Sequence, residues 1–297
     1  MSEGPLTKVL VTGAAGQLGS ALSATAPSSI KVCALTRADC DICDRAAVDS
    51  VLDAEAPQLL INAAAYTAVD RAEEDSAAAF AANAEAPLVL AEACAERGVR
   101  LFHVSTDFVF DGLNSSPYPT DATTAPLGVY GESKQAGERA VLNSRADALV
   151  LRTGWVYSHD GQNFMRTMLR LHDSLDEISV VSDQVGTPTD AYSLANALWA
   201  AAGRPELNGI YHWSDAGVCS WYDFALAIGE EAFALGLLQK IAGVNPIRTV
   251  DYPTPAARPA YSVLDKTRSW QDFDIPPTHW RSQLRAALLR LREADHG

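Results

Sequence analysis

The first half of the chain alternates short apolar segments with segments of helical spacing, and this alternation limits the fold more than any other feature. Aliphatic and β-branched residues predict five strands, at residues 8–12, 31–35, 59–62, 100–105 and 149–152. Helical spacing predicts helices between them, at residues 18–26, 45–54, 77–97 and 132–142. Strands that are apolar throughout are typical of parallel sheets covered by helices on both faces. Because crossovers between parallel strands are right-handed, we predict an α/β fold with a doubly wound parallel sheet.

A glycine pattern follows the first predicted strand and leads into the next helix. Gly13, Gly16 and Gly19 form a G-x-x-G-x-x-G motif. In this context Gly13 suits a tight turn, Gly16 the close approach of a pyrophosphate, and Gly19 the packing of helix on sheet. The unpaired amides of the helix N-terminus can then bind phosphate without a lysine. The motif predicts a Rossmann-type dinucleotide site, and a glycine-rich turn that binds nothing is the alternative.

The end of the second predicted strand is where such domains distinguish between the two nicotinamide cofactors. An acidic residue there binds the ribose hydroxyl of NAD, but this chain has Thr36 and Arg37. A hydroxyl and a guanidinium suit a 2′-phosphate, so we favour NADPH and keep NADH as the alternative. Asp41 and Ile42 follow and could flank the adenine. Arg37 as a solvated surface residue, and Asp41 as part of a helix N-cap region, are the structural alternatives.

The second half of the chain is less regular. Helices are expected at residues 164–171, 191–202, 221–235 and 279–292, and strands at 178–181 and 209–213. No Ser/Gly linker or block of charge separates the halves. We therefore expect a dinucleotide-binding domain over residues 1–155. Residues 156–297 would form mainly a substrate-binding lid, interleaved with the first domain.

The charge balance excludes two classes of partner. Lys and Arg number 23 against 37 Asp and Glu, a net charge of −14. Such a chain does not attract nucleic acid or an anionic membrane through its overall field. No apolar run approaches the roughly 18 residues of a membrane helix. The five cysteines lack a disulfide or metal spacing and no secretory signal pattern is present, so we expect free thiols and a cytoplasmic protein.

A tyrosine and a lysine four residues apart provide a candidate proton-transfer pair. Tyr130 and Lys134 share one face of a predicted helix. Reduction of a ketone needs a proton on oxygen, and a nearby cation lowers the pKa of a phenol near 10. Thr106 ends the fourth strand, where open α/β sheets place ligand-binding residues, and could hydrogen-bond the substrate oxygen. Ser105 competes for this role.

These motifs occur together in one known group of enzymes. The chain resembles the extended short-chain dehydrogenase/reductases, and most closely the dTDP-4-dehydrorhamnose reductase family. The resemblance covers nearly the whole chain, in the segments VTGAAGQLG (11–19), DCDICD (39–44), INAAAYTAVDRAE (61–73), VSTDFVFDG (104–112), VYGESKQAGE (129–138), LRTGWVYS (151–158), NFMRTMLRL (163–171), SDQVGTPT (182–189) and ARPAYSVLD (257–265).

The resemblance implies an activity and roles for single residues. It implies NAD(P)H-dependent reduction of the C4 ketone of dTDP-4-dehydro-6-deoxy-L-mannose to dTDP-L-rhamnose, in polysaccharide biosynthesis. Tyr130 would donate the proton, Lys134 would activate it and bind the ribose, and Thr106 would orient the ketone. Asn83 would complete an active-site water network. Contacts to the cofactor would come from Gly16, Gln17, Leu18, Asp41, Ile42, Ala65, Tyr66 and Thr67, and contacts to the nucleotide sugar from Thr106, Asp107 and Trp155.

The lid must also hold the diphosphate of a nucleotide sugar. Arg258 is the preferred candidate because its fork of donors suits phosphate, with Lys266 and Arg268 as weaker ones. A surface arginine beside a proline turn is the alternative for Arg258. Trp155 could pack on a sugar face or fill the lid core.

One departure from the family pattern concerns magnesium. Some members resemble magnesium-linked dimers with acidic residues after the glycine motif and after the Pro-Thr turn. Here Ser20 and Ala21 follow the glycine motif, and only Asp190 follows the turn. We therefore expect no metal site, and a monomer or a dimer without magnesium.

Two other functions are compatible with the same fold. A nucleotide-sugar epimerase or dehydratase would keep its cofactor bound, although a dehydratase needs an acidic pair where this chain has only Asp107. A non-catalytic subunit similar to the regulatory subunit of methionine adenosyltransferase would not need Tyr130, Lys134 and Thr106 together.

Overall fold

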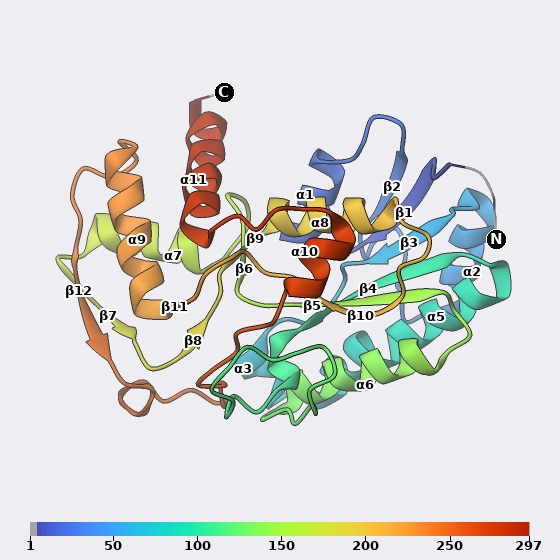
Figure 1. Ribbon diagram of the computed structural model, residues 1–297, viewed down its shortest axis with the longest axis horizontal. Helices are drawn as coiled ribbons and strands as arrows, with labels where there is room; N and C mark the ends of the chain where they lie inside the picture. Colours follow the sequence, from blue (N-terminus) through green and yellow to red (C-terminus); the bar gives the residue numbers. More distant parts are fainter. Residues whose placement is uncertain (1–4, 297) are drawn as a thin grey trace.

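A six-stranded parallel sheet forms the centre of the protein, as a computed structural model describes it for residues 5–296. The strand order is β10-β5-β4-β3-β1-β2, and every neighbouring pair is parallel (Figure 1). The order reverses beside β1, and ligands of open α/β sheets bind at such a point. The strands are β1 (Lys8–Thr12), β2 (Lys31–Leu35), β3 (Leu59–Asn62), β4 (Arg100–Thr106), β5 (Ala148–Thr153) and β10 (Gly209–His212).

Helices cover both faces of this sheet. On one face α1 (Gln17–Ala24) and α8 (Ala191–Ala202) bury leucine and alanine side chains against Val9, Ile61 and Leu151. On the other face, leucine and valine side chains of the covering helices pack on Leu10, Leu60 and Val150. The helices of this second face are α2 (Arg45–Glu55), α5 (Ala86–Arg97) and α6 (Val129–Asn143). The predicted α/β doubly wound parallel sheet is confirmed.

The predicted helix over 77–97 is divided in the structure. α4 (Ser76–Phe80) is followed by a π-helical turn, η1 (Ala81–Glu85), and only then by α5. Pro87 has no amide hydrogen and its ring conflicts with the carbonyl four residues earlier, at Asn83. The helix widens at this point, and such π turns are frequent at functional sites.

A second hydrophobic core lies beside the sheet. It is formed by α7 (Phe164–Ser174), α9 (Trp221–Ala234), α11 (Trp280–His296) and the parallel pair of β7 (Glu177–Val181) with β12 (Gly243–Ile247). Figure 1 shows these elements together at one end of the molecule. The remaining short elements are α3 (Val69–Ala72), α10 (Thr267–Phe273), β6 (Val156–Tyr157), β8 (Val185–Gly186), β9 (Thr189–Asp190), β11 (Cys219–Ser220), and the 3-10 turns Asp107–Val109 and Thr249–Asp251.

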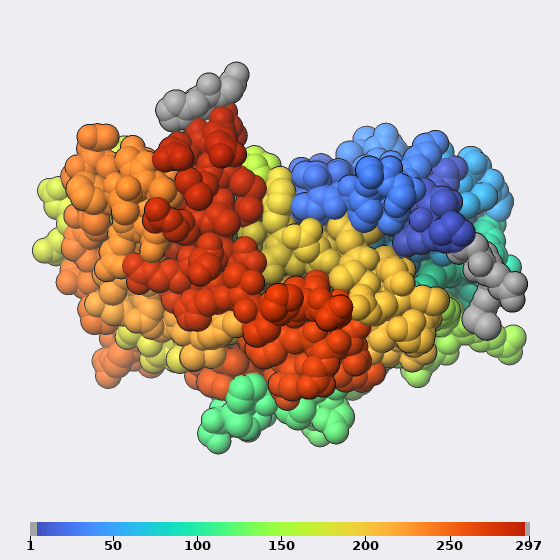
Figure 2. Space-filling model, turned by 45° about the horizontal axis from the view of Figure 1, so that its top comes forward, coloured from blue at the N-terminus to red at the C-terminus, as the bar shows by residue number. Residues whose placement is uncertain are grey.

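The chain returns from this second core to the sheet. α8 packs on α1, and β10 adds a parallel strand beside β5. On the face shown in Figure 2, residues near 200 (yellow) lie between the N-terminal part (blue) and the C-terminal helices (red). The terminal residues 1–4 and 297 of the two expected parts lie outside the described residues.

Candidate active site

The glycine motif forms the turn from β1 into α1. Gly13 has a φ of +73°, and a Cβ there would lie 2.6 Å from the Ala64 nitrogen. A Cβ on Gly19 would collide with the Gly13 carbonyl. Gly16 is the N-cap of α1 and provides no side-chain cap, so the first-turn amides of Gln17 and Leu18 have no intrahelical acceptor. The turn is therefore shaped to accept an anionic group at the helix end.

The side chains of the motif have separate contacts. Asn163 caps α7 and its Nδ2 donates to Gln17 Oε1 at 2.8 Å, which joins the motif to the second core. Leu18 is buried in the core between α1 and the sheet. Leu18 can therefore contact a cofactor through its backbone but not through its side chain.

Three buried polar residues connect the carboxyl ends of β1, β3 and β4. The Thr12 hydroxyl and the Ala64 amide donate to Asn62 Oδ1 at 2.7 and 3.1 Å. Asn62 Nδ2 lies 3.1 Å from His103 Nδ1. Because a backbone amide can only donate, Asn62 Nδ2 is the donor to His103. Burial lowers the pKa of His103 well below its ordinary value, so this imidazole is neutral.

Asn83 in the π turn organises two parts of the site. Its Oδ1 accepts from the Tyr66 amide at 2.8 Å, and its Nδ2 donates to the Tyr66 carbonyl at 3.0 Å. The same Nδ2 donates to Ser133 Oγ at 3.0 Å. Ser133 lies between Tyr130 and Lys134 on α6. Asn83 therefore fixes the turn of Ala65, Tyr66 and Thr67 against the helix that carries the predicted proton-transfer pair.

Tyr130 lies half-buried in the first turn of α6. Burial raises the pKa of its phenol to about 12, while a hydrogen bond between the phenol and the Thr106 side chain opposes the rise. The Phe108 ring packs edge-on, with the ring centroids 5.5 Å apart. The phenol therefore keeps its proton at neutral pH, as a proton donor must.

Lys134 is buried one turn after Tyr130. Its Nζ donates to the carbonyl of Val104 at 2.7 Å, which fixes the ammonium beside the end of β4. Burial lowers the pKa of Lys134 to about 8, and the Glu138 carboxylate opposes this shift. The lysine is still mainly charged at neutral pH. The structure thus places Thr106 against the Tyr130 phenol, with Lys134 one helical turn further along α6.

Thr106 and Asp107 end β4 and are both buried. Burial raises the pKa of Asp107 to about 6, and hydrogen bonds from Ser262 and Thr106 oppose the rise. Ser105 precedes Thr106, so its side chain points to the opposite face of the strand. Its hydroxyl is buried and has no hydrogen-bond partner within residues 5–296. The contact with Tyr130 favours Thr106 over Ser105.

The predicted selectivity residues lie at the sheet edge beside the glycine turn. The Ala14 amide donates to the Leu35 carbonyl at 3.0 Å, which brings the end of β2 to this turn. Thr36 Oγ1 donates to Asp39 at 2.7 Å. The Arg37 side chain is 87% exposed and lies 3.7 Å from Asp41. Ile42 is half-buried at the edge of the core beneath β1.

Trp155 and Arg258 contact other protein groups. Trp155 has a φ of +51° and stacks on Trp221 with 3.5 Å between the ring centroids. A Cβ on Gly186 would come within 2.5 Å of the Trp155 ring. Arg258 forms a two-point ion pair with Asp70. Lys266 lies buried beside Trp270, and the exposed Arg268 side chain pairs with Asp272.

Comparison with known proteins identifies the family. The family model described as RmlD substrate binding domain matches residues 7–293. The chain belongs to this family. It is 42% identical over 287 residues to the dTDP-4-dehydrorhamnose reductase of Aggregatibacter actinomycetemcomitans, covering 94% of this chain and 98% of the relative. The resemblance inferred from the sequence is confirmed.

Two solved structures of enzymes named dTDP-4-dehydrorhamnose reductase have the same fold as this chain. The dTDP-4-dehydrorhamnose reductase of Clostridium acetobutylicum gives a TM-score of 0.90 at 36% identity, over 96% of this chain and 100% of that one. The Bacillus anthracis enzyme, solved in complex with NADP, gives 0.90 at 32% identity, over 96% and 99%. The sequence analysis of this family member did not single out Thr12, Asn62 and Ser133, which the structure bonds to one another or to predicted site residues. A polar residue at the end of an apolar strand was the available signal for the first two.

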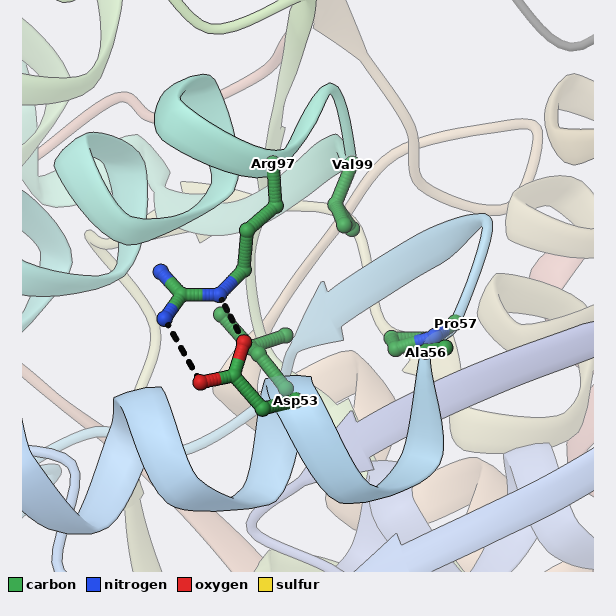
Figure 3. A pocket seen from close by; sticks show the side chains of 6 residues that line it. Asp53, Ala56, Pro57, Arg97 and Val99 are labelled. Atoms are coloured by element: carbon green, nitrogen blue, oxygen red, sulfur yellow. Dashed lines mark hydrogen bonds and ion pairs between the residues drawn. The ribbon is translucent and has the colours of Figure 1, made fainter.

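One surface hollow lies away from this site, at the opposite edge of the sheet. It has a volume of about 290 Å³ and is shown in Figure 3. Pro57 and Val99, which line it, precede β3 and β4, so the hollow lies at the amino edge of the sheet. Its Arg97 and Asp53 pair with each other at 2.7 and 3.2 Å. Its lining contains none of the predicted site residues of this family member.

The described part of the chain has neither a cluster of metal-ligating residues nor a membrane-spanning helix. Within residues 5–296, His, Cys, Asp and Glu form no group of three or more that could hold a metal ion. No helix in this range is both long and apolar enough to cross a membrane. The acid after the Pro-Thr turn, Asp190, is buried and pairs with Arg290 at 2.6 Å.

Proposed function

We propose that this family member is an NAD(P)H-dependent dTDP-4-dehydrorhamnose reductase. It would reduce the C4 ketone of dTDP-4-dehydro-6-deoxy-L-mannose to dTDP-L-rhamnose, in the biosynthesis of rhamnose-containing polysaccharide. The observation that carries the proposal is that Thr106 contacts Tyr130 and Lys134 bonds to Val104 at the carboxyl end of β4, on the same edge of the sheet as the glycine turn. The enzyme name shared by relatives over nearly the whole chain supports this substrate.

The residues present fit a dinucleotide. Gly13 and Gly19 allow the tight turn into α1, because a Cβ at either position would collide with backbone atoms, and the first turn of α1 presents unpaired amides. The bound cofactor would supply the hydride. The turn at residues 65–67, held by Asn83, together with Asp41 and Ile42, would border it. Lys134 would bind the nicotinamide ribose.

The proton-transfer step follows from the environment of the phenol. As hydride adds to C4, the ketone oxygen gains negative charge, and Tyr130 would donate its proton there. Thr106 would hydrogen-bond the same oxygen. The Lys134 ammonium would stabilise the phenolate that remains, by the attraction that lowers the pKa of a phenol beside a cation. General acid catalysis of this kind is worth roughly 10²–10⁴ in rate.

NADPH is our proposed cofactor, with NADH as the alternative. The exposed Arg37 guanidinium and the Thr36 hydroxyl lie at the end of β2, where a ribose 2′-phosphate would be read. Asp41, 3.7 Å from Arg37, partly offsets this positive charge. The solved relative from Bacillus anthracis binds NADP.

The nucleotide sugar would meet residues from both parts of the chain. We propose that Thr106, Asp107, Trp155 and Arg258 border it, with residues 1–155 binding the dinucleotide and residues 156–297 forming mainly the lid. The second core supports a separate lid, and α8 and β10 support its interleaving with the first part.

We propose a cytoplasmic enzyme that is a monomer or a dimer without magnesium. The described cysteines are all free thiols, which fits a reducing compartment. The Asp190 carboxylate is engaged by Arg290, which disfavours a cation at the same place. Sizing the protein with and without magnesium tests this. A magnesium-dependent change in size would overturn it.

A coupled assay tests the function. The protein is incubated with dTDP-4-dehydro-6-deoxy-L-mannose, generated enzymatically, and NADPH, and loss of reduced-cofactor absorbance is followed. We expect turnover with one NADPH oxidised per dTDP-L-rhamnose formed. Absence of turnover with either NADPH or NADH, in a protein that binds the cofactor, would overturn the proposal.

A further inference from the structure

Residues 256–265, here called the bridging segment, connect the lid to the substrate side of the site. The Val185 amide donates to the Ala260 carbonyl, and the Ser262 amide to the Val185 carbonyl, both at 2.8 Å. Further along, the Tyr118 amide donates to the Val263 carbonyl, also at 2.8 Å. The segment therefore lies between a lid strand and the loop that follows β4.

Two contacts bring the bridging segment to the catalytic edge. The Ser262 side chain hydrogen-bonds the buried Asp107 carboxylate, next to Thr106. Pro259 packs on Gly112, which has a φ of +75° and where a Cβ would lie 2.6 Å from the Pro259 Cβ. A displacement of the segment would therefore move groups that border the reacting ketone.

The start of this segment is tied to the dinucleotide-binding part by one ion pair. Arg258 Nη1 donates to Asp70 Oδ1 at 3.0 Å, and Nη2 donates to Asp70 Oδ2 at 2.8 Å. The Ala256 amide also donates to Asp70 Oδ1, at 3.3 Å. Asp70 lies on α3, just after the turn of residues 65–67 that would border the cofactor. The pair is only partly exposed, with 25% of the Arg258 side chain and 42% of the Asp70 side chain accessible.

We propose that Asp70 is a positioning residue for the reductase reaction, which holds the bridging segment at the substrate side of the site through its two-point bond to Arg258. This inference rests on the proposed function. Asp70 would not touch the substrate. It would fix the position of the groups that touch the substrate. It would also connect the turn of residues 65–67 with the bridging segment.

The occupied donors of Arg258 favour positioning over diphosphate binding. Besides both Asp70 oxygens, Arg258 Nη1 reaches Thr254 Oγ1 at 2.6 Å and the Ala256 carbonyl at 3.2 Å. Both terminal nitrogens are thus used within the protein. The bound Arg258 lowers the pKa of Asp70, which therefore stays ionised and cancels much of the guanidinium charge. A neutralised pair attracts an anion weakly, whereas a planar two-point bond fixes orientation well.

Four variants test the proposal. Asp70→Asn removes the charge but keeps the shape, Arg258→Lys keeps the charge but loses the fork, and a double variant combines them. Asp53→Asn is the matched control, because Asp53 forms the same two-point bond with Arg97 at the amino edge of the sheet (Figure 3). For each, KM and kcat with the nucleotide sugar, the Kd of NADPH and the unfolding midpoint are measured.

We expect Asp70→Asn to raise KM for the nucleotide sugar about fivefold, because a partly exposed two-point ion pair is lost. The Kd of NADPH should stay within about twofold, because the bridging segment borders the substrate side of the site. Arg258→Lys should behave alike, and the double variant should be no worse than either single variant because both changes break the same bond.

Three outcomes would overturn the proposal. An unchanged or lowered KM in Asp70→Asn, with a raised KM in Arg258→Lys, would instead make Arg258 a direct ligand of the diphosphate. A raised KM in Asp53→Asn would mean that any lost ion pair has the effect. A change in the unfolding midpoint of Asp70→Asn with unchanged KM would make the pair merely structural. A wild-type protein without reductase activity would instead refute the proposed function, which is a separate result.

Discussion

Polar side chains are buried at the carboxyl edge of the central sheet and exposed at its amino edge. At the carboxyl edge Asn62, Thr106 and Asp107 are buried, and burial raises the pKa of Asp107 to about 6. At the amino edge Asp53 is mostly exposed and pairs with Arg97 across an open hollow (Figure 3). Both edges belong to the same strands and the same hydrophobic layers. The difference therefore arises from what covers each edge.

From this contrast we expect function at the carboxyl edge and none at the amino edge. A buried polar group is costly unless it is hydrogen-bonded, so a chain keeps one where its chemistry is needed. An exposed ion pair costs little and contributes little. The predictions below test whether function is confined to the carboxyl edge.

The largest effect is expected at the phenol. Tyr130→Phe should lower kcat about 10³-fold, because it removes the proton donor and leaves the hydride geometry unchanged. The coupled assay measures this, with the Kd of NADPH as the control for folding. Turnover equal to the wild type would remove Tyr130 from the mechanism and weaken the contrast between the edges.

The next largest effect concerns Lys134 and pH. Because its pKa is about 8, the ammonium is present below that pH and is lost as pH rises through it. The kcat of the wild type should therefore fall above about pH 8. The kcat of Lys134→Met should be roughly 10²-fold lower than that of the wild type and should show no fall above pH 8. A wild-type pH profile that stays flat to pH 9.5 would contradict a charged Lys134 in catalysis.

The same residue predicts a trend in stability. The unfolded lysine has the ordinary pKa of 10.5, and the folded one about 8, so the unfolded state binds more protons between these values. The free energy of unfolding of the wild type, relative to Lys134→Met, should rise from pH 8 to pH 10. Denaturant unfolding at several pH values measures it. A falling difference would mean that burial does not lower this pKa.

A smaller effect is expected at the cofactor edge. Arg37→Ala should reduce the preference for NADPH over NADH about fivefold, because one exposed charge-assisted contact to the 2′-phosphate is lost. The ratio of kcat/KM for the two cofactors measures it. An unchanged ratio would make Arg37 a solvated surface residue, which the sequence left as the alternative.

The smallest effect is expected at the amino edge. In Asp53→Asn the kcat/KM for the nucleotide sugar should stay within about twofold of the wild type, as for most exposed substitutions. A clear loss of activity would show that this edge communicates with the site.

Local sequence patterns predicted much of the fold and several residues of the candidate site. The alternation of strand and helix, the glycine turn and the spacing of Tyr130 and Lys134 depend on residues near each other in the chain. The division of the helix before α5 was missed, because it depends on how Pro87 conflicts with the Asn83 carbonyl. The resemblance named Asn83, but its bonds to Tyr66 and Ser133 join segments 17 and 50 residues apart.

The second half of the chain was least accessible to prediction. Trp155 was assigned either to a sugar face or to the lid core, and the structure stacks it on Trp221. Arg258 was proposed from its chemistry alone, and its pairing with Asp70 spans 188 residues. No local periodicity links positions so far apart, because such contacts exist only once distant parts of the chain pack together.

By itself the sequence determined the parallel sheet, the glycine turn, the family resemblance and the spacing of Tyr130 and Lys134 on one helix. Each of these depends on short-range spacing, which the backbone geometry of strands and helices converts directly into shape. Only the tertiary structure decided the surroundings: which groups are buried, which pKa values shift, and which arginine is already paired. Burial and pairing depend on distant segments meeting, and they set the free energy of each charge.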